Sequence, residues 1–213
     1  MGSNFLSKAR DKAMPLKNTI STYGSIAILV HWTVAFAVVG LFVLGLWMVD
    51  LNYYSPWYHD APAIHKAIGV LLFLVMGFRL VWRLVNRVPL PEPGQKVWEI
   101  KAAETTHVLL YILIFTVIAS GYLISTAEGK PIDVFGLMSV PALISGLPKQ
   151  ADVAGWVHFI LAVGLIGFSA LHALAALKHH FIDRDLTLKR MLGLKKGDGH
   201  SSQSLETTTE THP

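Results

Sequence analysis

Long runs of apolar residues dominate the hydrophobic pattern of this chain. The three clearest are residues 26–49, 108–127 and 154–177. Each has the roughly 20 residues that an α-helix needs to cross a hydrocarbon core of about 30 Å. A fourth run, 63–85, contains Lys66, Arg79 and Arg83 near its ends, where long basic side chains can reach the lipid–water interface. The pattern therefore predicts an all-α integral membrane protein whose four spanning helices form a bundle.

The composition supports the same class and excludes several kinds of site. Only 15% of the 213 residues are charged, against roughly 25% in a soluble domain. The chain has no cysteine, which excludes disulfides, thiolate metal sites, iron–sulfur clusters and thioether-attached haem. The predicted organisation is a polar N-terminal arm (1–20), one four-span domain (21–192) and a polar, disordered tail (193–213).

The basic residues predict the orientation of the bundle. Three segments carry most of the lysines and arginines: the N-terminal arm, the region from the end of the second span to the third span, and the region after the fourth span. Together they hold 15 of the 18, namely Lys8, Arg10, Lys12, Lys17, Arg79, Arg83, Arg87, Lys96, Lys101, Lys178, Arg184, Lys189, Arg190, Lys195 and Lys196. Because Lys and Arg accumulate on the cytoplasmic side, both termini are expected there. This distribution explains the excess of basic over acidic residues without a nucleic-acid partner.

Four histidines lie inside the predicted spans, where an imidazole is costly unless its nitrogens are satisfied. With the orientation above, His31 in span one and His172 in span four fall near the cytoplasmic side. His65 in span two and His158 in span four fall near the outer side. The histidines therefore form two pairs at two depths of the bilayer.

The spacing between His158 and His172 points to a pair of stacked cofactors. Fourteen residues make close to four turns, so both side chains project from one helix face about 21 Å apart. Haem iron accepts axial imidazoles from facing helices of a bundle, and two haems would fit these depths. A lone membrane histidine is more often an interhelical hydrogen-bonding group. Transport of metal ions or protons is disfavoured, because none of the four runs contains Asp or Glu.

Several sequence stretches resemble the bacterial cytochrome b561 family. They are His31-Trp32, "APAIHKAIGV" (61–70), "WVHF" (156–159), "LHALAALKHHF" (171–181) and "GYLISTAEGKPIDVFG" (121–136). The resemblance covers nearly all of residues 20–192. It implies a four-helix inner-membrane protein with two b-type haems, and it assigns His31 with His172 to one haem and His65 with His158 to the other. Some family members pass electrons to ubiquinone, and one type oxidises superoxide as it does so.

Five further residues are candidates for binding the cofactors or substrates. Arg79 and Arg83 are placed to pair with haem propionates or a quinone headgroup, although they could equally be membrane anchors. His107 matches a family position that is not a ligand, and it could contact a propionate. His179 could exchange protons with a quinone, since its unperturbed pKa of about 6.5 suits that task. Lys66, next to His65, could pair with a propionate of the outer haem and guide an anionic donor.

These features predict a dihaem b-type cytochrome embedded in the lipid of the bacterial inner membrane. It would carry electrons across that membrane between an outer-side partner and the quinone pool. One alternative is a superoxide oxidase that reduces ubiquinone. Another is a membrane-anchor subunit of a separate dehydrogenase.

Overall fold

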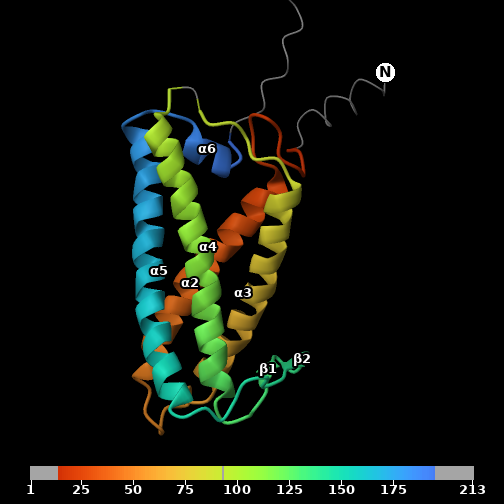
Figure 1. Cartoon of the computed structure of the whole chain (residues 1–213), viewed down its shortest axis with the longest axis vertical. Helices are drawn as coiled ribbons and strands as arrows, with labels where there is room; N and C mark the ends of the chain where they lie inside the picture. Colours follow the sequence, from red (N-terminus) through yellow and green to blue (C-terminus); the bar gives the residue numbers. More distant parts are fainter. Residues whose placement is uncertain (1–13, 93, 195–213) are drawn as a thin grey trace, which may run out of the picture.

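Four long helices form the body of the protein. The computed structural model describes residues 14–92 and 94–194. Its helices and strands are α2 (Ser25–Val49), α3 (Asp60–Val85), α4 (Val97–Thr126), β1 (Ile132–Val134), β2 (Met138–Val140), α5 (Gln150–Phe181) and α6 (Thr187–Met191). Figure 1 shows α2 to α5 side by side, with the short α6 at one end of the bundle and the β1–β2 hairpin at the other. These ends are named the α6 end and the hairpin end below.

The four long helices correspond to the four predicted spans. All of α2, α3, α4 and α5 are long and apolar enough to cross a membrane. The prediction of an all-α membrane four-helix bundle is therefore confirmed in its main body. The disorder predicted for the tail falls on residues that, from 195 onward, lie outside the described ones. Most of the N-terminal arm (1–13) also lies outside them.

Two details differ from the sequence prediction. Helix α4 begins at Val97, eleven residues before the apolar run at 108, because its first turns are helical but carry Glu99, Lys101 and Glu104. The connection before α5 contains an antiparallel hairpin in which Ile132 pairs with Val140. Two strands of three residues are too short to dominate the hydrophobic pattern of the chain.

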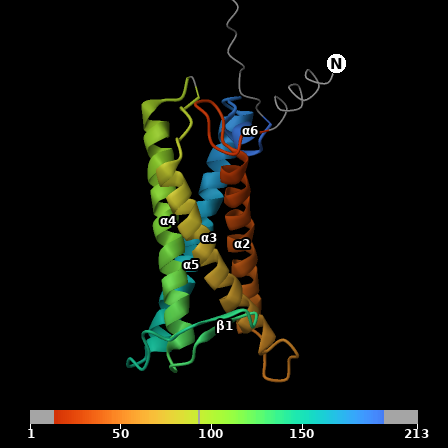
Figure 2. The ribbon, with the colours of Figure 1, turned by 90° about the vertical axis from the view of Figure 1, so that its right-hand side faces the viewer.

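Helix α6 packs over the neighbouring helix ends through hydrogen bonds and an ion pair. Arg190 of α6 is only 7% exposed, donates a hydrogen bond to the carbonyl oxygen of Leu90 (2.9 Å), and lies 3.0 Å from a carboxylate oxygen of Glu92. The indole nitrogen of Trp32 donates to the carbonyl oxygen of Met191 (2.9 Å). These contacts tie α6 to α2 and to the loop between α3 and α4, and both views place α6 at this end of the bundle (Figures 1 and 2).

The buried apolar core lies midway along the bundle. Its fully packed members are Val34, Val38, Leu72, Met76, Ile114 and Leu165. Leu165 is seven residues from both His158 and His172, and Leu72 is seven from both His65 and Arg79. The core is therefore an apolar layer that separates the two depths at which the histidines lie.

Candidate haem-binding sites

The pair of histidines at the hairpin end comes from α3 and α5. The ring centroids of His65 and His158 are 6.2 Å apart. Because metal–imidazole bonds are about 2.0–2.1 Å long and the ring centre lies about 1 Å beyond the nitrogen, two imidazoles on opposite faces of one metal have centroids about 6 Å apart. The spacing of this pair therefore fits two axial ligands of a single iron.

Hydrogen bonding at His158 prepares the other ring nitrogen for ligation. Its Nδ1 lies 2.9 Å from the carbonyl oxygen of Val117 and 3.2 Å from Oγ of Ser120, both on α4. A carbonyl oxygen only accepts, so Nδ1 carries the proton and donates to it, which leaves the lone pair on Nε2. Metal-ligating histidines have this arrangement, with the second nitrogen donating to a carbonyl or carboxylate.

The partner ring, His65, is less well satisfied. Its Nδ1 is buried and has no hydrogen-bond partner within residues 14–92 and 94–194. A buried polar atom without a partner is unfavourable and calls for an explanation such as a bound group. The chemistry at both rings therefore fits a metal-bearing cofactor between them.

Two glycines leave room for these imidazoles. A Cβ at Gly121 of α4 would lie 3.1 Å from Cε1 of His158, and a Cβ at Gly45 of α2 would lie 3.3 Å from Cε1 of His65. Both distances are tighter than an ordinary van der Waals contact, so each ring occupies the space that a side chain on the facing helix would need. The pattern of apolar runs gives no signal for these two positions.

The pair at the α6 end comes from α2 and α5. The ring centroids of His31 and His172 are 6.3 Å apart, again close to the spacing of two axial ligands. His107 of α4 lies beside them, with its ring centroid 5.1 Å from that of His172. Three helices therefore bring three imidazoles together at this depth.

Arg79 holds one of these rings in a tautomer unsuited to ligation through Nε2. Its Nη2 lies 2.9 Å from Nδ1 of His31. A guanidinium group only donates hydrogen bonds, so Nδ1 accepts and the proton of the neutral ring is on Nε2. Ligation of iron through Nε2 therefore requires Arg79 to leave His31 and to find another acceptor.

The two arginines of α3 lie near an aromatic ring, and the described residues offer them no carboxylate partner. The guanidinium carbons of Arg79 and Arg83 are 5.5 Å and 5.9 Å from the ring centroid of Tyr111. Among the residues that the structure describes, neither forms an ion pair. A pair of guanidinium groups placed in this way suits an anionic or carbonyl-bearing ligand. Tyr111 was not foreseen from the sequence.

His179 lies in a different cluster at the α6 end. Its Nδ1 is 2.8 Å from Oδ2 of Asp183 and 3.4 Å from Oδ2 of Asp185. The ammonium group of Lys178 bridges Asp183 (2.7 Å) and Glu99 (2.9 Å). Ligand atoms of Glu99, His179 and Asp183 lie within 4.8 Å of one another, but the ammonium group of Lys178 already contacts both carboxylates.

Lys66 is exposed at the hairpin end, one position after His65. The two other basic residues of this end are Lys130 and Lys149. Lys130 pairs with Glu128 at 2.7 Å, whereas the described residues offer no ion-pair partner to Lys66 or Lys149. Lys66 is therefore the unpaired cation nearest in sequence to a predicted ligand.

The sequence of this chain is similar to that of known membrane cytochromes. The model of the prokaryotic cytochrome b561 family matches residues 22–194. The chain belongs to the prokaryotic cytochrome b561 family. It is 49% identical over 185 residues to cytochrome b561 homolog 2 of Escherichia coli K12, covering 87% of this chain and 98% of the relative. It is also 29% identical over 183 residues to the probable superoxide oxidase CybB of Yersinia pestis, covering 82% and 98% respectively.

Family membership confirms the broad predictions made from the sequence. The protein is a b-type membrane cytochrome, and four spanning helices in a prokaryotic family place it in the bacterial inner membrane as a multi-pass protein. The number of haems, their histidine ligands and the substrate remain predictions.

Gly121→Ala is expected to weaken haem retention at the hairpin end. The new methyl group displaces the His158 ring and lengthens its hydrogen bond to Val117. Changes next to a metal ligand cost about 10–100-fold in affinity, so we expect about a 10-fold loss. Haem content per polypeptide, measured during washing with a haem-binding apoprotein, tests this. Gly40→Ala is the matched control, because nothing lies within 4 Å of its Cβ position. Equal haem loss in the two variants would contradict the role of Gly121.

Proposed function

We propose that this protein is a dihaem cytochrome that carries electrons across the inner membrane between an outer-side partner and the quinone pool. His65 and His158 hold one haem b, and His31 and His172 hold the other. The observation that carries the proposal is the presence of two imidazole pairs, 6.2 Å and 6.3 Å between centroids, at two depths separated by a buried apolar layer.

The distribution of basic residues supports an orientation with the α6 end in the cytoplasm. Arg184, Lys189 and Arg190 lie at or near α6, Arg83 lies in the last turn of α3, and Arg87 lies in the loop between α3 and α4 at the same end. The hairpin end then faces outward. Electrons cross the membrane between the two histidine pairs.

When bound, each haem would supply one-electron oxidation and reduction, and the two histidines that would hold it would leave no open position on the iron for a substrate. The residues around the haems therefore decide what exchanges electrons with them. On the cytoplasmic side, Arg79 released from His31 and the neighbouring Arg83 bind propionates or a quinone oxygen. His107, 5.1 Å from His172 between ring centroids, contributes a further polar group there.

Quinone reduction also consumes protons, and His179 is suited to deliver them. It lies at the end of α5 between Asp183 and Asp185, in contact with charged groups of the α6 end. An imidazole flanked by carboxylates can accept a proton from water and release it toward a substrate.

The experiment that tests the proposal uses purified protein in proteoliposomes. Two haems per polypeptide and a b-type reduced-minus-oxidised spectrum are expected, with reduction by a quinol added outside and reoxidation by an acceptor on the other side. A single haem, or spectra insensitive to quinol, would contradict the proposal.

Superoxide oxidation is a second candidate function. It is favoured by the similarity to the probable superoxide oxidase of Yersinia pestis and by the exposed Lys66 beside a predicted ligand of the outer haem. Rapid superoxide loss coupled to ubiquinone reduction would distinguish this enzyme from a simple carrier. Stable co-purification of a soluble dehydrogenase would instead indicate an anchor subunit.

Lys66→Gln is expected to slow reduction of the outer haem by an anionic donor while both haems are retained. A fixed positive charge raises the association rate of an anion, and salt weakens the effect. The rate with superoxide should therefore fall and depend less on ionic strength than in the parent protein. Lys149→Gln is the control, since Lys149 is also unpaired among the described residues but lies far from His65 in sequence. Identical rates and salt slopes in Lys66→Gln and the parent would show that Lys66 is only an anchor.

A further inference from the structure

The loop between β1 and α5 contains a stretch that is unusual for an exposed segment. Residues 134–148, "VFGLMSVPALISGLP", lie between Asp133 and Lys149 and include no charged side chain. Most of the large apolar side chains in this segment are exposed: Phe135, Leu137, Met138, Leu143, Ile144 and Leu147. Leu137 and Leu143 are 87% and 81% exposed. Exposed apolar surface of this extent is typical of a site that contacts another apolar phase.

The segment is held in place through its backbone. The hydroxyl of Tyr122 donates to the carbonyl oxygen of Pro141 (2.8 Å) and accepts from the amide of Leu143 (2.7 Å). The buried Thr126 and Gln150 both donate to the carbonyl oxygen of Ile144, at 2.9 Å and 3.2 Å. The loop is thus ordered by side chains from the ends of α4 and α5. Most of its large apolar side chains nevertheless remain exposed.

The hairpin is built in the same way. Ile132 and Val134 are buried, and β1 packs against α3, the helix that carries His65. The turn that follows has Phe135 and Gly136 in the left-handed region, with φ of 55° and 69°, and Asp133 accepts a hydrogen bond from the amide of Gly136 (2.9 Å). One face of the hairpin therefore contacts the bundle near its end (Figure 2), and the tip carries exposed apolar side chains.

We propose that residues 134–148 form an interfacial element whose exposed side chains lie in the lipid of the leaflet at the hairpin end. Three observations select lipid as the occupant. The segment has no charge, whereas a surface that docks a soluble redox partner uses charges to steer it. Its exposed apolar surface continues onto the first turns of α5, where Val153, Trp156 and Phe159 are exposed on a membrane-spanning helix.

The third observation is the hydrogen bonding of the loop. Non-helical backbone is tolerated at the edge of the hydrocarbon region only where protein groups satisfy its N–H and C=O groups. The contacts from Tyr122, Thr126 and Gln150 supply such partners, and the amide of Gly146 donates to the carbonyl oxygen of Ala127 (3.1 Å). Lipid contact would keep the hairpin pressed against α3, over the end of the bundle where His65 and His158 meet.

Site-directed spin labelling tests this proposal, because the natural sequence has no cysteine to remove. Leu137→Cys and Leu143→Cys carry the label at the two most exposed apolar positions of the segment, and Lys130→Cys carries it at an exposed, charged position between α4 and β1. Haem-loaded protein is studied in nanodiscs that hold one copy and, separately, in nanodiscs that hold two. Collision rates with oxygen, which concentrates in lipid, and with a water-soluble nickel chelate are measured by electron paramagnetic resonance.

The labels at 137 and 143 are expected to collide several-fold more with oxygen, relative to the nickel chelate, than the label at 130. Equal ratios at the three positions would show that the loop faces water and would overturn the proposal. Shielding from the chelate that appears only in discs with two copies would also overturn it, because the loop would then contact a second copy of the chain. Haem content equal to that of the parent protein verifies that each variant is folded.

Discussion

Alanine at His158 or His65 is expected to remove one haem, and alanine at His172 or His31 is expected to remove the other. In the proposed arrangement each imidazole supplies one of two axial bonds, so a haem left with a single histidine in detergent is lost or becomes high-spin. The variants should therefore contain about one haem per polypeptide where the parent contains two. Haem content from the pyridine haemochrome and the reduced-minus-oxidised spectrum measure the loss. His59→Ala is the control, because His59 lies in the loop before α3 and contacts Tyr58.

Double variants make this prediction sharper. His65 and His158 have ring centroids 6.2 Å apart, so changing both should cost no more haem than changing one. Changing His158 together with His172 should remove both haems, since the two lie fourteen residues apart on one helix, or about 21 Å. If His31→Ala and His65→Ala had the same spectrum and their double variant retained one haem, the assignment of ligands to two depths would be wrong.

The sequence was sufficient to predict the helices and the pairing of the histidines, for a physical reason. A membrane-spanning helix has a length fixed by the bilayer, so the position of a residue along an apolar run gives its depth. His31 is six residues into its run and His172 is near the end of another, which places them at one level, and the structure brings their rings together. Depth alone could not reveal that α4 continues outside the apolar run as far as Val97.

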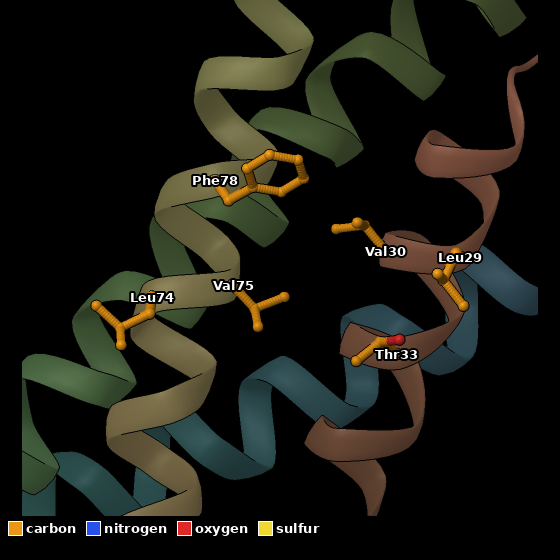
Figure 3. Close-up of a pocket in the computed structure, with 6 residues that line it drawn as sticks. All are labelled: Leu29, Val30, Thr33, Leu74, Val75 and Phe78. Carbon is orange, nitrogen blue, oxygen red and sulfur yellow. The ribbon is translucent and has the colours of Figure 1, made fainter. Parts of the chain in front are cut away.

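Other parts of the candidate sites depend on packing that no linear pattern contains. Gly45 and Gly121 matter because each faces an imidazole from a different helix, and other glycines such as Gly40 have nothing near them. The contact of Arg79 with Nδ1 of His31 depends on how closely α2 and α3 approach each other. An open apolar crevice between these helices, lined by Leu29, Val30, Thr33, Leu74, Val75 and Phe78, is equally a product of their crossing (Figure 3). The sequence places these residues at suitable depths but cannot show which of them meet.

Protein without haem is expected to be much less stable to heat than the haem-loaded protein. A ligand present at about 1,000 times its dissociation constant stabilises the folded state by about 4 kcal/mol, and in chains of this size each kcal/mol raises Tm by about 2–4 °C. Loss of two such haems should therefore lower Tm by roughly 15–30 °C. Differential scanning fluorimetry of protein produced with and without haem supply, in the same detergent, measures the difference.

The two haems should contribute unequally to this stability. Without the haem at the α6 end, Arg79 still donates a hydrogen bond to His31 (2.9 Å), so that ring keeps a partner. At the hairpin end, Nδ1 of His65 is buried without a partner in the described part of the chain, and an unsatisfied buried group costs about 1–3 kcal/mol. His158→Ala should therefore lower Tm more than His172→Ala, by about 2–12 °C from the combined ranges. Equal Tm values for these two variants would show that Arg79 does not stabilise the ring of His31. An unchanged Tm on removal of both haems would mean that the bundle is stable without them.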